Sequence, residues 1–130
     1  MKGQHQKGAA AVEFALILPV LVLLLFGIVE FSLLLYNKQI ITNASREGAR
    51  FGIVAGNNEA SIIDVVDAYS EDNLITFGSA TGPTTTVSGA GGTFGNDLIV
   101  TITYDYDFLV LANLGFDPVT LTAKTVMKLE

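Results

Sequence analysis

Cysteine is absent from the 130-residue chain, histidine occurs once, and basic residues are scarce in the second part of the sequence. The lack of cysteine excludes disulfides and thiol chemistry, and it carries no information about the compartment. Residues 53–130 contain ten acidic residues against two basic ones, Lys124 and Lys128, so this region has a net charge of −8. It lacks the basic surface that nucleic-acid binding requires, and we exclude that class of function.

One apolar run, from Ala9 to Tyr36, dominates the N-terminal part of the chain. Residues 14–29 carry no charge, and as a helix they would cover about 24 Å, so the continuation to Tyr36 makes the run long enough to cross a membrane. It is too long for the apolar core of a cleavable secretory signal. Basic residues before it and acidic residues after it predict a single-pass protein of the cytoplasmic (inner) membrane, with Met1 inside and Glu130 outside.

Two glutamates and a proline interrupt this run. A carboxylate at membrane depth is unfavourable by about 3 kcal/mol, so Glu13 and Glu30 are both candidates for a function. For Glu30 the simpler interpretation, a residue at the outer membrane interface, is favoured. Pro19 removes a helical hydrogen bond, which predicts a kink or local loosening. It can be an ordinary membrane-helix proline or can let the helix stretch during packing.

The segment from Gly8 to Phe14, GAAAVEF, resembles the processing site of type IV prepilins, above all that of the TadE-like pseudopilins of tight-adherence (Tad) secretion systems. The resemblance implies that a prepilin peptidase cuts after Gly8 and makes Ala9 the new N-terminus. A glycine at the cut lets the backbone enter a peptidase cleft in extended form. Glu13 of one subunit would then pair with the buried amine of Ala9 of a neighbour and set the register between subunits. Glu13, Phe14 and Pro19 are therefore candidate assembly residues.

Helical periodicity continues beyond Tyr36 and predicts one helix from about Ala9 to Ala55, about 70 Å long. An apolar stripe along its second half is expected to pack partly on its own domain and partly on other subunits. The stripe consists of Ile40, Ile41, Ala44, Gly48, Phe51 and Val54.

The segment from Ala44 to Gly52 also resembles the TadE-like pattern, in which a Gly-Ala-Arg sequence follows the membrane helix. Ala44, Gly48 and Gly52 recur at every fourth position and form a small-residue face that allows close helix packing. Arg46 and Arg50 form another face, for which solvation is favoured over contact with a second subunit.

The sequence thus divides into a leader at 1–8, the long helix at 9–55, embedded in the membrane to about residue 36, and an extracytoplasmic α+β domain at 56–130. In the domain, Asn57 or Asn58 is expected to cap a second helix, Gly89–Gly95 to form a mobile loop, and Phe108–Leu114 to form a compact turn or a single helical turn. An antiparallel sheet of three to four strands is expected. The predicted strands are 74–77, 84–87, 97–106 and 119–129.

The residues of the domain offer little chemistry. Because His5 lies in the leader, neither a His-based triad nor a His/Cys zinc site can form in the processed chain. Asp97, Asp105 and Asp107 could bind calcium, but EF-hand spacing is absent, and charges at a solvated strand edge are the favoured interpretation. We expect no enzymatic activity and no cofactor.

The resemblance implies a structural function, that of a minor pilin or pseudopilin in the assembly of a Tad-type pilus for adherence or secretion. Major pilins of that system are typically shorter and lack such a domain, which favours the minor role over a filament-forming major subunit. Expected partners are a prepilin peptidase, other pilin and pseudopilin subunits, the inner-membrane assembly platform and membrane lipid. The alternative from another class is an uncleaved, membrane-anchored scaffold or binding protein.

Overall fold

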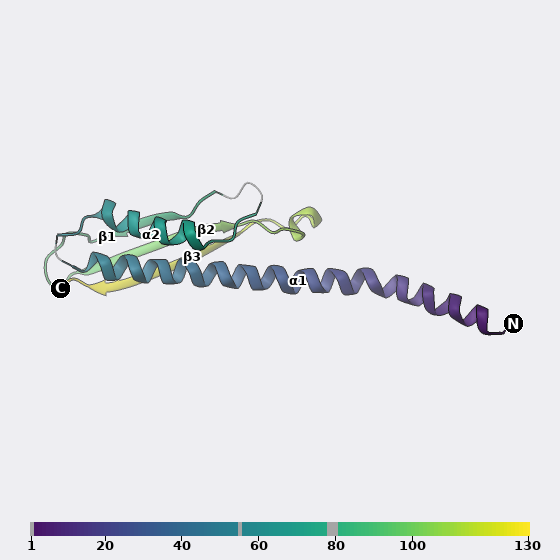
Figure 1. The fold of residues 1–130 in the computed structure, drawn as a ribbon. Coiled ribbons are helices and arrows are strands. Elements are labelled where there is room, and N and C mark those ends of the chain that lie inside the picture. Colours follow the sequence, from purple (N-terminus) through teal and green to yellow (C-terminus); the bar gives the residue numbers. More distant parts are fainter. Residues whose placement is uncertain (1, 55, 78–80) are drawn as a thin grey trace.

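The computed structural model describes residues 2–54, 56–77 and 81–130, and within these ranges the side chains from Gly8 onward. The helices are α1 (Lys2–Gly52), α2 (Glu59–Asn73) and the short 3₁₀ helix η1 (Leu111–Leu114); the strands are β1 (Thr84–Ser88), β2 (Asp97–Tyr106) and β3 (Val119–Lys128). All elements after α1 gather along its C-terminal half, while its N-terminal half projects away from them (Figure 1). The predicted α+β class, with a long N-terminal helix, a second helix and an antiparallel sheet, is confirmed.

Helix α1 contains 51 residues, which corresponds to a length of about 76 Å. It begins at Lys2 rather than near Ala9, and it continues through Pro19. It ends at Gly52, where the side-chain amide of Asn57 donates to the carbonyl of Phe51 at 2.6 Å. The predicted end at Ala55 lies outside the described residues.

Helix α2 starts at a complete capping box. The side chain of Asn58 accepts from the backbone N–H of Ser61 at 2.9 Å, and the hydroxyl of Ser61 accepts from the backbone N–H of Asn58 at 3.2 Å. This arrangement satisfies donors that a helix start leaves open. Ile62 and Val66 on the inner face are fully buried.

The segment after α2 differs from the prediction, because residues 74–77 do not form a strand. The side chain of Asn37, buried on α1, accepts from the backbone N–H of Ile75 at 3.0 Å and donates to its carbonyl at 2.7 Å. Both backbone groups that Ile75 would offer to a neighbouring strand are therefore occupied by one amide.

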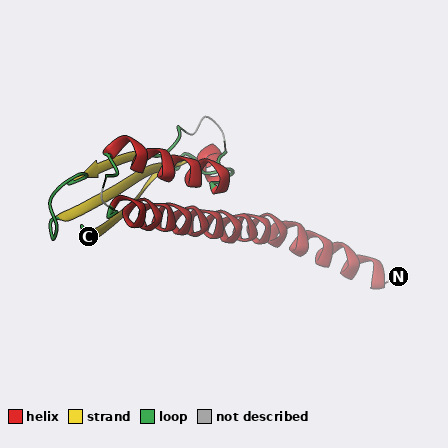
Figure 2. Cartoon of the chain, turned by 60° about the vertical axis from the view of Figure 1, so that its left-hand side comes forward, coloured by secondary structure: helices red, strands yellow, loops and turns green. Residues whose placement is uncertain are grey.

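The sheet has the order β1-β2-β3 with both pairs antiparallel. In β2 every second residue is buried, namely Leu98, Val100, Ile102, Tyr104 and Tyr106. Both helices lie on one face of the sheet (Figure 2), and the buried side of β2 packs against them. The three later predicted strands are thus confirmed, with ends that differ by at most one residue.

The connection from β2 to β3 contains η1, which confirms the expected single helical turn. At its start, the ring of Phe108 packs edge-on against Tyr106 with centroids 5.6 Å apart. At its end, Gly115 adopts a left-handed conformation with φ of 89° and donates to the carbonyl of Ala112 at 3.1 Å. Glycine adopts this conformation without steric strain, so the chain can reverse here into β3.

Candidate functional site

The N-terminal half of α1 is not covered by any other part of the described chain. All residues from Gly8 to Val29 are exposed except Gly27, which is half-buried. The helix is long and apolar enough to cross a membrane. The exposed part corresponds to about 33 Å, slightly more than the roughly 30 Å of a bilayer core. Because an apolar surface of this size is unfavourable in water, the fold defines a single-pass membrane-anchored protein.

The predicted cleavage residues, Gly8 and Ala9, lie at the start of this exposed part. A methyl group placed on Gly8 would meet no heavy atom within 4 Å, so nothing in the described chain shields the bond between them. The bond lies within α1. A peptidase that binds its substrate in extended form must therefore unwind this turn of helix.

The predicted assembly residues Glu13, Phe14 and Pro19 are all exposed on the same projecting half of α1. Glu13 follows Ala9 by four residues, a rise of about 6 Å along the helix. Within the described chain, no hydrogen bond or ion pair engages the Glu13 carboxylate. These three side chains thus remain accessible to groups outside the chain.

Glu30 has a different environment, which the sequence did not predict. It is fully buried, and its carboxylate accepts hydrogen bonds from the backbone N–H groups of Val110 and Leu111 at the start of η1. The Leu111 nitrogen lies 3.2 Å from one carboxylate oxygen of Glu30 and 3.4 Å from the other. The interpretation of Glu30 as a simple interfacial residue is therefore incomplete, because this side chain joins α1 to the β2–β3 connection.

Two buried tyrosines of β2 follow this contact, and Tyr106 is close enough to Glu30 to be affected by its charge. Burial, and after it the charge of Glu30 and the nearby Tyr104, raise the pKa of Tyr106 above its usual value. Burial and the charge of Asp107 raise the pKa of Tyr104 in the same way. Neither hydroxyl has a hydrogen-bond partner among the described residues, so both stay neutral and pack as large apolar side chains.

The small-residue face of α1 lies against the domain of the same chain. Ala44 and Gly48 are buried, and a methyl group on Gly48 would overlap with Cγ2 of Val66 in α2. A methyl group on Gly52 would lie 2.6 Å from Leu98 in β2. Glycine therefore lets α1 approach both α2 and the sheet closely.

The apolar stripe of α1 is only partly used by this packing. Ile41 is fully buried, whereas Phe51 and Val54 at the far end are 37% and 59% exposed. Arg46 and Arg50 are exposed on a different face, and they help to line an open groove of about 450 Å³ together with Tyr69 and Met127. Whether other subunits contact these side chains stays a prediction.

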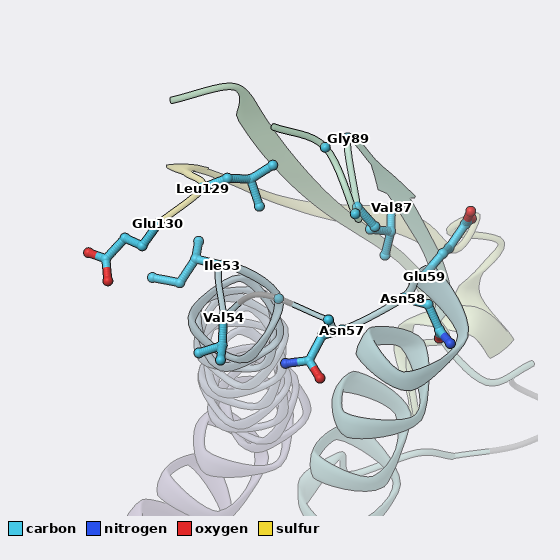
Figure 3. A pocket seen from close by; sticks show the side chains of 14 residues that line it. Ile53, Val54, Asn57, Asn58, Glu59, Val87, Gly89, Leu129 and Glu130 are labelled. Carbon is cyan, nitrogen blue, oxygen red and sulfur yellow. The ribbon is translucent and has the colours of Figure 1, made fainter. Parts of the chain in front are cut away.

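A second open cavity, of about 410 Å³, lies at the end of the domain opposite to the projecting half of α1. It is lined by the chain after α1, the turn at Gly89–Gly92 and the C-terminal residues Leu129 and Glu130 (Figure 3). In the same view the carboxylate of Glu130 points away from the cavity. Glycines and Ala90 make up a large part of the lining, and among its described residues no set of side chains typical of catalysis converges.

The three aspartates considered for calcium are not brought together. Asp97 and Asp105 lie eight residues apart in β2, about 27 Å along an extended strand. Asp97 pairs with Lys128 at 2.6 Å, and Asp105 accepts from the hydroxyl of Thr120 at 2.6 Å. β2 is the central strand of the sheet, but β1 pairs only with Ile99–Thr103. Asp97 and Asp105 lie outside this stretch and pair with β3 alone, so the interpretation of these charges as edge protection stays a prediction. In the described ranges no group of three or more His, Cys, Asp or Glu residues is placed to hold a metal ion.

The comparison with protein families agrees with the geometry of the N-terminal helix. The family model for TadE-like protein matches residues 8–50, from the proposed cleavage glycine to the second arginine of α1. No curated protein and no solved structure matches the chain. The TadE-like resemblance is thereby confirmed over this segment. The match covers about a third of the chain and leaves the domain after α1 without a counterpart among the compared families.

Proposed function

We propose that this protein is a minor pilin or pseudopilin that a prepilin peptidase processes between Gly8 and Ala9 and that takes part in assembly of a Tad-type pilus. The observation that carries the proposal is that the TadE-like match begins at Gly8 itself and covers the exposed apolar half of α1. An apolar helix that its own domain leaves uncovered can pack against lipid before assembly and against other subunits afterwards.

Hydrolysis of the Gly8–Ala9 bond adds one water and leaves a carboxylate on Gly8 and an amine on Ala9. The protonated amine would lie at the end of an apolar helix, where an unpaired charge is strongly unfavourable. Glu13 is exposed and has no partner within the described chain, which supports its proposed pairing with the amine of a neighbouring subunit. Pairing of this kind fixes the axial offset between two α1 helices.

The orientation and the subunit class belong to the same proposal. Lys2 and Lys7 precede the apolar run, and the acidic region follows it, so we place the N-terminus in the cytoplasm and the domain on the outer side of the inner membrane. The described residues beyond Glu30 form a domain whose core packs around the second half of α1. This size favours a minor subunit over a short filament-forming one, and we expect contacts with other pilin subunits and with the inner-membrane assembly platform.

The proposal is tested by the intact mass of the protein extracted from membranes of cells with and without an active prepilin peptidase. We expect a chain that starts at Ala9 only when the peptidase is present. Gly8→Val should block processing. Gly27→Val is the matched control and should not block it, because the structure has open space for a side chain at both glycines. An intact Met1 in a fully functional protein would refute the proposal and favour the uncleaved scaffold.

A further inference from the structure

The loop that carries η1 exposes three large apolar side chains. Leu109, Leu114 and Phe116 are 44%, 54% and 57% exposed, and we call them the proximal apolar patch. The loop lies at the end of the sheet nearest to the projecting half of α1, as Figures 1 and 2 both show. Because their exposure is unfavourable in water, we expect a surface outside the chain to cover them.

The position of this loop along α1 is fixed by Glu30. The continuous exposed part of the helix ends at Val29, and the next side chain, Glu30, holds the backbone of Val110 and Leu111. Beyond it Phe31, Leu35 and Tyr36 are still exposed, but the domain covers the helix in part, since Leu33 and Leu34 are half-buried against its core. Counted outward from Gly8, a bilayer core of about 30 Å is crossed after about 20 residues, which is close to residue 28. The membrane surface and the η1 loop therefore lie at the same height on the helix.

The polar groups of the η1 loop limit how deeply this loop can enter the membrane. Asp107 and Asp117 flank it, and its irregular backbone would be unsatisfied in hydrocarbon. If the membrane extended to Tyr36, the loop would be submerged by about 10 Å. An outer boundary near Glu30 instead places the loop in the interfacial layer, where apolar side chains insert and charges stay hydrated.

From this geometry we propose that the proximal apolar patch is a membrane contact, which rests on the outer leaflet of the bilayer that α1 crosses. The occupant is the lipid interface itself. No Lys or Arg lies between Asp107 and Asp117, so the contact depends on apolar insertion rather than on anionic headgroups. The inference requires that α1 spans a membrane, but it does not require cleavage at Gly8.

The test uses the full chain in nanodiscs of zwitterionic phosphatidylcholine, at one chain per disc, with a nitroxide on single introduced cysteines. The natural lack of cysteine makes the labelling specific. Leu114→Cys and Phe116→Cys report on the patch, and Leu23→Cys reports on the span. Phe94→Cys is the matched control, because Phe94 is 86% exposed at the opposite end of the domain. The measured quantity is accessibility to oxygen relative to a water-soluble nickel complex.

We expect the highest oxygen-to-nickel ratio at Leu23, the lowest at Phe94, and a ratio at Leu114 and Phe116 several-fold above that at Phe94. Equal ratios at the patch and at Phe94, with Leu23 in lipid, would overturn the inference and leave the membrane span intact. An aqueous environment at Leu23 would instead refute the span itself. Protection of the patch only in discs with several chains would overturn the lipid contact in favour of a second subunit.

Discussion

Replacement of Glu30 by alanine would remove the side chain that joins α1 to the η1 loop. A hydrogen bond to a charged group contributes about 1.5–3 kcal/mol, and the Glu30 carboxylate accepts from two backbone N–H groups. Val110 and Leu111 are half-buried, so water can replace part of the lost hydrogen bonding to their backbone N–H groups. We therefore expect Glu30→Ala to lower the free energy of opening of this loop by about 2 kcal/mol, which corresponds to about 30-fold faster amide exchange.

Hydrogen–deuterium exchange of the membrane-inserted protein, read on peptides that cover residues 108–116, measures this effect directly. Glu30→Gln should change the rate only a few-fold, because one oxygen of Glu30 already accepts from both N–H groups and a glutamine oxygen can replace it. Glu47→Ala is the matched control, since Glu47 is an exposed glutamate on the same helix. Equal exchange in Glu30→Ala and the unmodified protein would refute the tethering role of Glu30.

Two further substitutions test the packing of α1 and its assembly role. Gly48→Ala should destabilise the domain by about 1 kcal/mol, because overlap with Val66 outweighs the gain in helix propensity. Near-UV circular dichroism of the tyrosines during thermal unfolding measures this loss of stability, with Gly27→Ala as the control. Glu13→Ala should leave processing largely intact but strongly reduce incorporation into filaments, measured as the pilus-bound fraction. Normal incorporation would contradict the pairing with Ala9.

The sequence predicted those parts of the fold that depend on periodicity and on local chain signals. The strand predicted at 97–106 coincides with β2. The start of α2 was predicted at Asn57 or Asn58, and the structure selects Asn58 as the cap. The TadE-like resemblance likewise depends on neighbouring residues, and the family match over residues 8–50 confirms it. Each of these signals lies within one element, so one sequence is sufficient to read it.

The features that the sequence did not predict are contacts between distant residues. Asn37 binds Ile75 across 38 positions and prevents a strand there, and Glu30 binds Val110 across 80 positions. Local propensity carries no information on such pairs, because any buried amide or carboxylate needs a partner but the sequence does not say which one. The unusual position of Glu30 in an apolar run marked it as a candidate, and only the fold supplied its partner.

Glu13 and Glu30 together show why a charge in an apolar run has no single interpretation. Glu13 lies near the start of the exposed part of α1 without a partner in the described chain, whereas Glu30 lies at its end and is satisfied within the domain. The helix between Glu30 and Gly52 is packed on α2 and the sheet, so this half and the domain form one body. If assembly draws α1 out of the membrane, the domain must move with it, and the helix before Glu30 is the part that exchanges lipid for other subunits without cover from the domain.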